Sequence, residues 1–152
     1  MSDTAPRDQL PPTIARILSR FQAMGREEKM QSLVHYSKKL EPLPERFASI
    51  DRTGFTVPEC QTRVDLFPES RDGKLHFYAD VDVRQSPTVA AFLAIVFSVI
   101  NDQPAETTLA IPGDFVSRIM EGIGLSGREV GLNGMVARLK RYALASRPGQ
   151  RA

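Results

Sequence analysis

The only cysteine among the 152 residues, Cys60, has the clearest chemical potential in this sequence. It lies within residues 57–64 (VPECQTRV), where an irregular segment gives way to a predicted strand. A single thiol cannot form an internal disulfide, and His35 and His76 alone do not complete a zinc cluster. Three roles stay open: an inert buried thiol, a nucleophile, or a thiol that reacts with the sulfur of another protein. Because its neighbours are polar and a proline lies just before them, we expect Cys60 to be accessible on a loop rim.

A cysteine hydrolase would require a histidine base within reach of the thiol. His35 falls inside a predicted helix and His76 on a strand face opposite its apolar neighbours, so neither histidine is aimed at the loop. Thiol exchange with another protein requires only a thiolate, access and a cation that stabilises the charge. Arg63 is expected to be a solvated charge, and Arg128 is the cation that folding could bring near Cys60.

No other catalytic or metal-binding motif is present. The sequence has no glycine-rich phosphate loop, no His-Glu-x-x-His pattern and no dinucleotide fingerprint. The acidic residues are scattered, and the pair Asp80 and Asp82 is more typical of a strand end than of a metal site. We therefore predict that the chain binds neither a metal nor a cofactor.

Composition indicates one ordinary globular domain. Hydrophobic residues make up 41% of the chain and charged residues 25%, which is near the average for folded domains. A net charge of +2 is too small to indicate nucleic acid as the main partner. The first twelve residues have no apolar core of the kind found in signal peptides, and the apolar run 89–100 is too short to span a membrane. We expect a cytoplasmic protein with no membrane contact, with residues 1–12 and 146–152 as flexible tails.

Two amphipathic helices are predicted first. The earlier one has an apolar stripe at helical spacing and ends at Gly25. That stripe consists of Ile14, Ile17, Leu18, Phe21 and Met24. The second has Glu27 and Glu28 in its first turn and Lys38 and Lys39 in its last turn. Its predicted buried positions are Met30, Leu33, Val34 and Leu40. Prolines at 42 and 44 end it, and residues 46–58 are predicted to be a surface connection.

Alternation of apolar and polar residues predicts a hairpin with one covered face. The first strand covers 61–67, and the second contains Leu75, Phe77 and Ala79. The intervening Arg71-Asp72-Gly73 is typical of a hairpin turn. Residues 81–84 are a candidate third strand. Cys60 then lies at the open mouth of the hairpin.

The second half of the chain is predicted to be helical. Ser86 and Pro87 begin a nearly all-apolar helix over 88–100 that crosses the covered sheet face. Short helices follow over 104–109 and 114–123. Ser126 and Glu129 form a capping box for a long last helix, with Arg128 in its first turn. The glycines at 131 and 134 weaken this helix by about 1 kcal/mol each, so we interpret them as places of close backbone packing or of a passing loop.

Several segments together resemble the SufE family of sulfur-acceptor proteins. They are Phe21, Lys29-Met30, 36–44 (YSKKLEPLP), 57–64 (VPECQTRV), 125–128 (LSGR) and 133–135 (NGM). The resemblance runs over nearly the whole length, and the combination is far more specific than any one segment. It implies a single α+β domain over 1–152, similar to iron–sulfur scaffold proteins of the IscU type, with a small antiparallel sheet covered by helices.

The resemblance also implies a role for two residues. Cys60 would take the terminal sulfur from the persulfide of a SufS-type, pyridoxal-phosphate-dependent cysteine desulfurase and deliver it to the SufBCD scaffold. Arg128 matches the family's arginine near the thiol loop and would stabilise the thiolate or persulfide. The pyridoxal cofactor belongs to the desulfurase. The protein would be an accessory of the desulfurase without independent turnover, as a monomer or a homodimer.

Two other functions stay open. The chain could assemble an iron–sulfur cluster itself, but clusters are normally held by several thiolates, so a scaffold with one cysteine needs a dimer or foreign ligands. It could also be an interaction domain with an inert cysteine. Resistance of Cys60 to alkylation in the folded protein would favour the latter.

Overall fold

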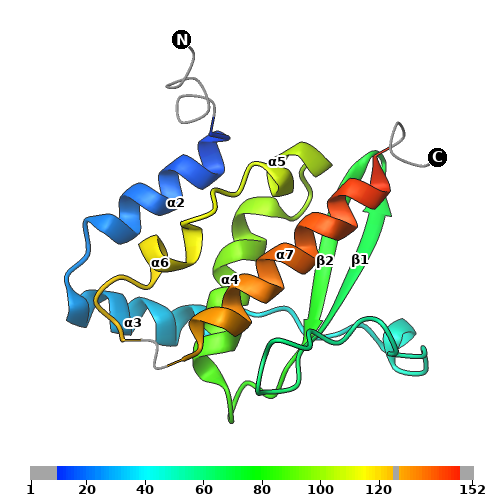
Figure 1. Ribbon diagram of the computed structural model, residues 1–152, viewed down its shortest axis with the longest axis horizontal. Coiled ribbons are helices and arrows are strands. Elements are labelled where there is room, and N and C mark those ends of the chain that lie inside the picture. The colour runs from blue at the N-terminus through cyan, green and yellow to red at the C-terminus, as the bar shows by residue number, and fades with distance from the viewer. Residues whose placement is uncertain (1–9, 125–126, 148–152) are drawn as a thin grey trace.

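The helix α4 (Pro87–Ile100) lies between a group of helices and a two-stranded hairpin (Figure 1). The structure is a computed structural model that describes residues 10–124 and 127–147. Eleven of the fourteen α4 residues are buried, as the apolar run predicted. Pro87 begins the helix, and Ser86 holds the position before it. The Ser86 hydroxyl makes no capping bond, however, because it donates to Thr62 Oγ1 at 3.0 Å.

The helices α2 (Pro12–Gln22) and α3 (Arg26–Ser37) pack on one side of α4. In α2 the predicted stripe is buried from Ile14 to Phe21, whereas Met24 lies beyond the end of the helix and is half-buried. In α3 the predicted face is only partly correct. Leu33 is buried, whereas Met30 and Val34 are 43% and 56% exposed. Lys29 is buried instead, since its ammonium donates to the carbonyl of Glu121 at 2.9 Å and its aliphatic stem covers apolar surface. The helix ends at Ser37, before the two lysines that were predicted to close it.

The predicted hairpin is confirmed, with antiparallel strands β1 (Asp65–Arg71) and β2 (Lys74–Asp80). The strand predicted over 61–67 begins four residues later, because residues 61–64 belong to a loop. Its two-residue turn places Asp72 and Gly73 at φ values of 52° and 79°, the left-handed geometry that tight hairpins require. The candidate third strand at 81–84 is wrong. The Asp82 carboxylate accepts hydrogen bonds from the backbone N–H groups of Arg84 and Gln85, which folds this segment into a turn instead of a strand.

Both faces of the hairpin are covered, so the prediction of one covered face is also wrong. One face, with Leu66, Leu75, Phe77 and Ala79, joins the hydrophobic core. The other lies under the segment 41–56, which includes the short 3-10 helix η1 (Glu45–Phe47). The Phe47 ring lies 5.1 Å from that of Phe67 and 5.3 Å from that of Tyr78. The expected surface connection is therefore a cover for the sheet.

The remaining helices are α5 (Ala105–Leu109), α6 (Phe115–Ile119) and α7 (Glu129–Ser146). The helix α6 ends four residues before the predicted boundary. The long α7 contacts β1, α5 and α6, and Figure 1 shows it lying across α4 and the hairpin. The predicted capping residue Ser126 lies outside the described residues, and Arg128 occupies the position before α7. The helices α2 and α7 reach Pro12 and Ser146, the inner ends of the predicted tails.

Candidate thiol site

Cys60 lies near the tip of a closed loop, residues 57–64, called the thiol loop from here on. The backbone N–H of Val57 donates to the carbonyl of Val64 at 2.9 Å and closes the loop. Just outside this bond, Thr56 and Asp65 form an isolated antiparallel bridge. The two ends of the loop thus meet at one place, called the neck from here on, which consists of Thr56, Val57, Val64 and Asp65. Cys60 lies at the open end of the hairpin, as predicted.

The thiol loop rests on α7 at its two glycines. A methyl group at Gly131 would lie 3.2 Å from Cys60 Cα and 3.4 Å from Cys60 Sγ. At Gly134 it would lie 2.9 Å from Glu59 Cβ, closer than side-chain carbons approach in folded proteins. Both glycines are buried. Of the two interpretations of these glycines, the structure shows a passing loop, and the loop is the one that contains the cysteine.

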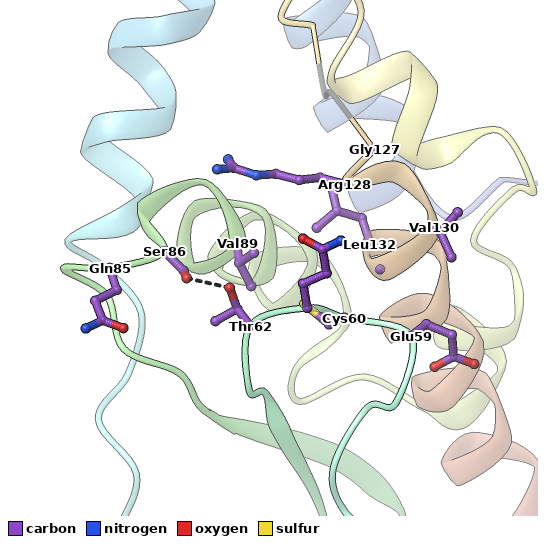
Figure 2. A pocket seen from close by; sticks show the side chains of 12 residues that line it. Glu59, Cys60, Thr62, Gln85, Ser86, Val89, Gly127, Arg128, Val130 and Leu132 are labelled. Carbon is purple, nitrogen blue, oxygen red and sulfur yellow. Dashed lines mark hydrogen bonds between the residues drawn. The ribbon is translucent and has the colours of Figure 1, made fainter.

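A cavity of about 370 Å³ opens beside Cys60 (Figure 2). The thiol loop forms one side, and the start of α4 forms a second side with Ser86 and Val89. The third side consists of Arg128, just before α7, and Val130 in the first turn of α7. Cys60 is partly buried and packs against the core. Cys60 therefore forms part of the wall of a space that a reagent or a protein segment could enter.

Arg128 and Cys60, which are 68 positions apart in the sequence, line the same cavity. Arg128 is exposed, and Figure 2 shows its side chain extended with the guanidinium directed away from Cys60. Arg63 is exposed as expected, and it also pairs with Asp65 at 3.3 Å. Only Arg128 of these two arginines lines the cavity.

Neither histidine approaches the thiol. His35 is exposed on α3. His76 is buried, not on an open face, and its ring nitrogens contact the carboxylates of Glu41 at 2.9 Å and Asp102 at 3.0 Å. No histidine lines the cavity, so the arrangement lacks the Cys–His pair that hydrolysis would require.

Two contacts at the thiol loop, those of Thr62 and Asp65, were not predicted from the sequence. Thr62, near the tip, accepts the hydrogen bond from Ser86 at the start of α4. Asp65, at the neck, is 1% exposed and binds two arginines and a threonine. The signal for Asp65 was its place in an alternating strand, which indicated a solvent-facing residue. Two of its partners, Arg52 and Thr56, lie in a segment with no regular pattern, so nothing in the sequence pointed to its burial.

Residues 10–124 and 127–147 contain no group of three or more histidine, cysteine or acidic side chains placed to hold a metal ion. Over the same ranges, no helix has the length and apolar character needed to cross a membrane.

Comparison with known proteins gives a consistent family. Residues 15–143 match the SufE family model, described as an Fe–S metabolism associated domain. Uncharacterized SufE-like proteins from two strains of Mycobacterium tuberculosis are 31% identical over 142 residues, which cover 91% of this chain and 95% of theirs. A SufE-like protein of Synechocystis is 25% identical over 93% of this chain and 86% of its own. The solution structure of a hypothetical protein from Thermus thermophilus superposes with a TM-score of 0.72 at 26% identity, covering 91% of this chain and all of that one.

Proposed function

Because this chain belongs to the SufE family and is thereby associated with iron–sulfur metabolism, we propose that it is a sulfur-acceptor protein whose Cys60 receives sulfur from a cysteine desulfurase. The sulfur would pass on to a SufBCD-type scaffold for cluster assembly. The observation that carries the proposal is the placement of the one thiol, which lies on a closed loop at the rim of a cavity. The protein would act as an accessory of the desulfurase and complete no catalytic cycle of its own.

The transfer is a thiol–persulfide exchange. The Cys60 thiolate attacks the terminal sulfur of the donor's persulfide, a new S–S bond forms at Cys60, and the donor cysteine leaves as a thiolate. The sulfur keeps its oxidation level, so no oxidant or reductant is consumed. A protein with one cysteine suits this step, since no second thiol in the chain can attack the new persulfide and release the sulfur as a disulfide forms.

Arg128 would stabilise the negative charge that moves between the sulfurs. Within the part of the chain that the structure describes, no carboxylate forms an ion pair with its guanidinium, and its side chain is exposed beside the cavity. A hydrogen bond to a charged group contributes about 1.5–3 kcal/mol, and about 1.4 kcal/mol of barrier corresponds to a tenfold change in rate. Loss of the guanidinium should therefore slow transfer about tenfold or more.

The test is incubation with a desulfurase and cysteine without reductant, followed by intact-mass measurement. The wild-type chain should gain the mass of one sulfur atom at Cys60, and Cys60→Ser should gain none and fail to stimulate the desulfurase. Arg128→Ala should slow the gain. Arg141→Ala, which changes an exposed arginine of α7 outside the cavity, should not. An unmodified Cys60 beside a donor that demonstrably carries a persulfide would falsify the proposal.

A further inference from the structure

The neck of the thiol loop contains a buried carboxylate. Asp65 is 1% exposed, and its two oxygens accept hydrogen bonds from three side chains. Thr56 Oγ1 lies 2.5 Å from Oδ1, and Arg52 Nη1 and Arg63 Nε lie 3.0 Å and 3.3 Å from Oδ2. A buried carboxylate with this many partners is held in one orientation.

These partners come from both stems of the loop. Thr56 directly precedes the thiol loop, and Arg63 is its last residue but one. One carboxylate thus ties the outgoing stem to the returning stem, in addition to the backbone bond between Val57 and Val64. Without the Asp65 side chain, the backbone bonds from Val57 to Val64 and from Leu66 to Phe55 would have to hold the two stems together.

Arg52 connects the neck to the rest of the sheet. Asp65 lies directly opposite Asp80 in the hairpin register, and two like charges in that position repel each other. Arg52 Nη1 hydrogen-bonds to both carboxylates. Burial by itself would raise the pKa of Asp65, but the hydrogen bonds from Thr56 and Arg52 and the charge of Arg63 outweigh it and hold the pKa below its usual value. Asp65 is therefore a carboxylate anion at neutral pH.

We propose that Asp65 is a positioning residue for the Cys60 thiol, because it binds both stems of the thiol loop and thereby fixes where the sulfur lies against α7. Asp65 does not line the cavity beside Cys60, so it acts through the loop and not on the reacting atoms. The inference rests on the proposed function for its meaning, since the fixed sulfur is the one that would accept the transfer.

The structure supplies a matched control at the far end of the same strand. Glu69 is also a carboxylate on β1 that pairs with two arginines, Arg46 and Arg71, at 2.8 Å and 2.9 Å. It lies beside the hairpin turn, away from the thiol loop. A change at Glu69 therefore removes a comparable set of charge pairs without touching the neck.

The experiment measures the rate at which iodoacetamide alkylates Cys60 in the folded, full-length protein, together with urea unfolding. In Asp65→Asn the neck loosens and the loop leaves α7 more often, so alkylation should accelerate about tenfold, which corresponds to about 1.4 kcal/mol. Glu69→Gln should change the rate less than about twofold. Thr56→Val, which keeps the side-chain shape and removes one donor, should accelerate alkylation in the same direction as Asp65→Asn.

The outcomes separate a positioning role from a purely structural one. If Asp65→Asn and Glu69→Gln lose stability but alkylate at the wild-type rate, Asp65 only supports the fold and the inference is overturned. If Asp65→Asn does not fold, Thr56→Val decides: a wild-type alkylation rate overturns the inference and a faster one supports it. Alkylation needs no desulfurase, so this result is independent of whether sulfur transfer itself is observed.

Discussion

Replacement of Gly134 by alanine tests the contact between α7 and the thiol loop. Inside a helix, alanine is favoured over glycine by about 1 kcal/mol, and Gly134 is the sixth residue of α7. The added methyl group would lie 2.8 Å from Glu59 Oε1, 3.0 Å from Cδ and 2.9 Å from Cβ. The first two atoms can rotate away. The Cβ atom cannot, so the backbone next to Cys60 must move.

The two effects oppose each other. Overpacking of a close contact costs about 1–3 kcal/mol, so the Gly134→Ala variant should lose between about 0 and 2 kcal/mol of unfolding free energy. Removal of the Glu59 side chain should reverse this sign. In a Glu59→Gly background no Cβ atom is present, and Gly134→Ala should then stabilise the protein by about 1 kcal/mol.

Urea denaturation of the four proteins in this double-mutant cycle measures the coupling. We expect about 1–3 kcal/mol, within the range for residues in contact. Glu59→Ala is the matched control, because it removes Oε1 and Cδ and retains Cβ, so it should relieve only part of the conflict. Additivity of Gly134→Ala and Glu59→Gly within about 0.5 kcal/mol would show that the loop does not rest on α7 in solution, and the account of both glycines would fail.

Three further predictions concern the rest of the molecule. The hydrogen bond from Arg46 holds the pKa of Glu69 below its usual value. The ionised Glu69 therefore stabilises the folded protein above about pH 4.3, and this stabilisation is lost as the pH falls and the carboxylate is protonated. Wild type should therefore lose more stability than Glu69→Gln between pH 5 and 3 in urea titrations, by up to about 1 kcal/mol. Burial lowers the pKa of Lys140, and the nitrogen NMR shift of its ammonium should titrate below pH 10.5. Phe47→Ala removes ring contacts with Phe67 and Tyr78 worth about 0.5–1.5 kcal/mol each, and thermal unfolding should show a loss of about 2 kcal/mol.

The elements around the thiol followed from local pattern. Period-two alternation and Arg71-Asp72-Gly73 predicted the hairpin, and the apolar run predicted α4. The glycines in α7 were predicted to mark a close approach because glycine in a helix is unfavourable unless space requires it. Each of these inferences depends on residues that are neighbours in the sequence or on one face of one element.

The second face of the hairpin could not be predicted in the same way. Its residues, Asp65, Phe67, Glu69 and Tyr78 among them, alternate with the core residues and include charges, which is typical of a solvent face. Asp65, Phe67 and Tyr78 are buried and Glu69 is half-buried, because side chains of an irregular segment reach them. These side chains are Arg46, Arg52, Phe47 and Phe55. That segment has no periodicity, so its side-chain partners are defined only by the tertiary fold. The failed prediction that Met30 and Val34 are buried has the same cause. The way α3 packs in the tertiary fold decides which of its faces is buried, and its composition does not.

One stripe of residues on α7 explains how the thiol loop can be held in place at its base while the tip that contains Cys60 can still move. Gly131, Gly134, Arg138 and Tyr142 follow one another at helical spacing along the helix. The glycines meet the tip of the loop, at Cys60 and Glu59, through van der Waals contact. The two larger side chains donate hydrogen bonds to backbone carbonyls on either side of the thiol loop. Arg138 Nη1 donates to the carbonyl of Gly54 at 2.5 Å, and the Tyr142 hydroxyl donates to the carbonyl of Leu66 at 3.0 Å.

The strength of attachment to α7 therefore rises from the tip of the loop towards its base. Moving the tip away from the glycines breaks no hydrogen bond to α7 among the described residues, whereas moving the neck would break those of Arg138 and also those of Asp65. Net hydrogen bonds contribute about 0.5–1.5 kcal/mol each, and more when a charged group takes part. Among the described residues, one hydrogen bond, from Ser86 to Thr62, ties the tip to another element, the start of α4. Among residues 54–66 the tip, which includes Cys60, should therefore separate from α7 at a lower free energy than the neck.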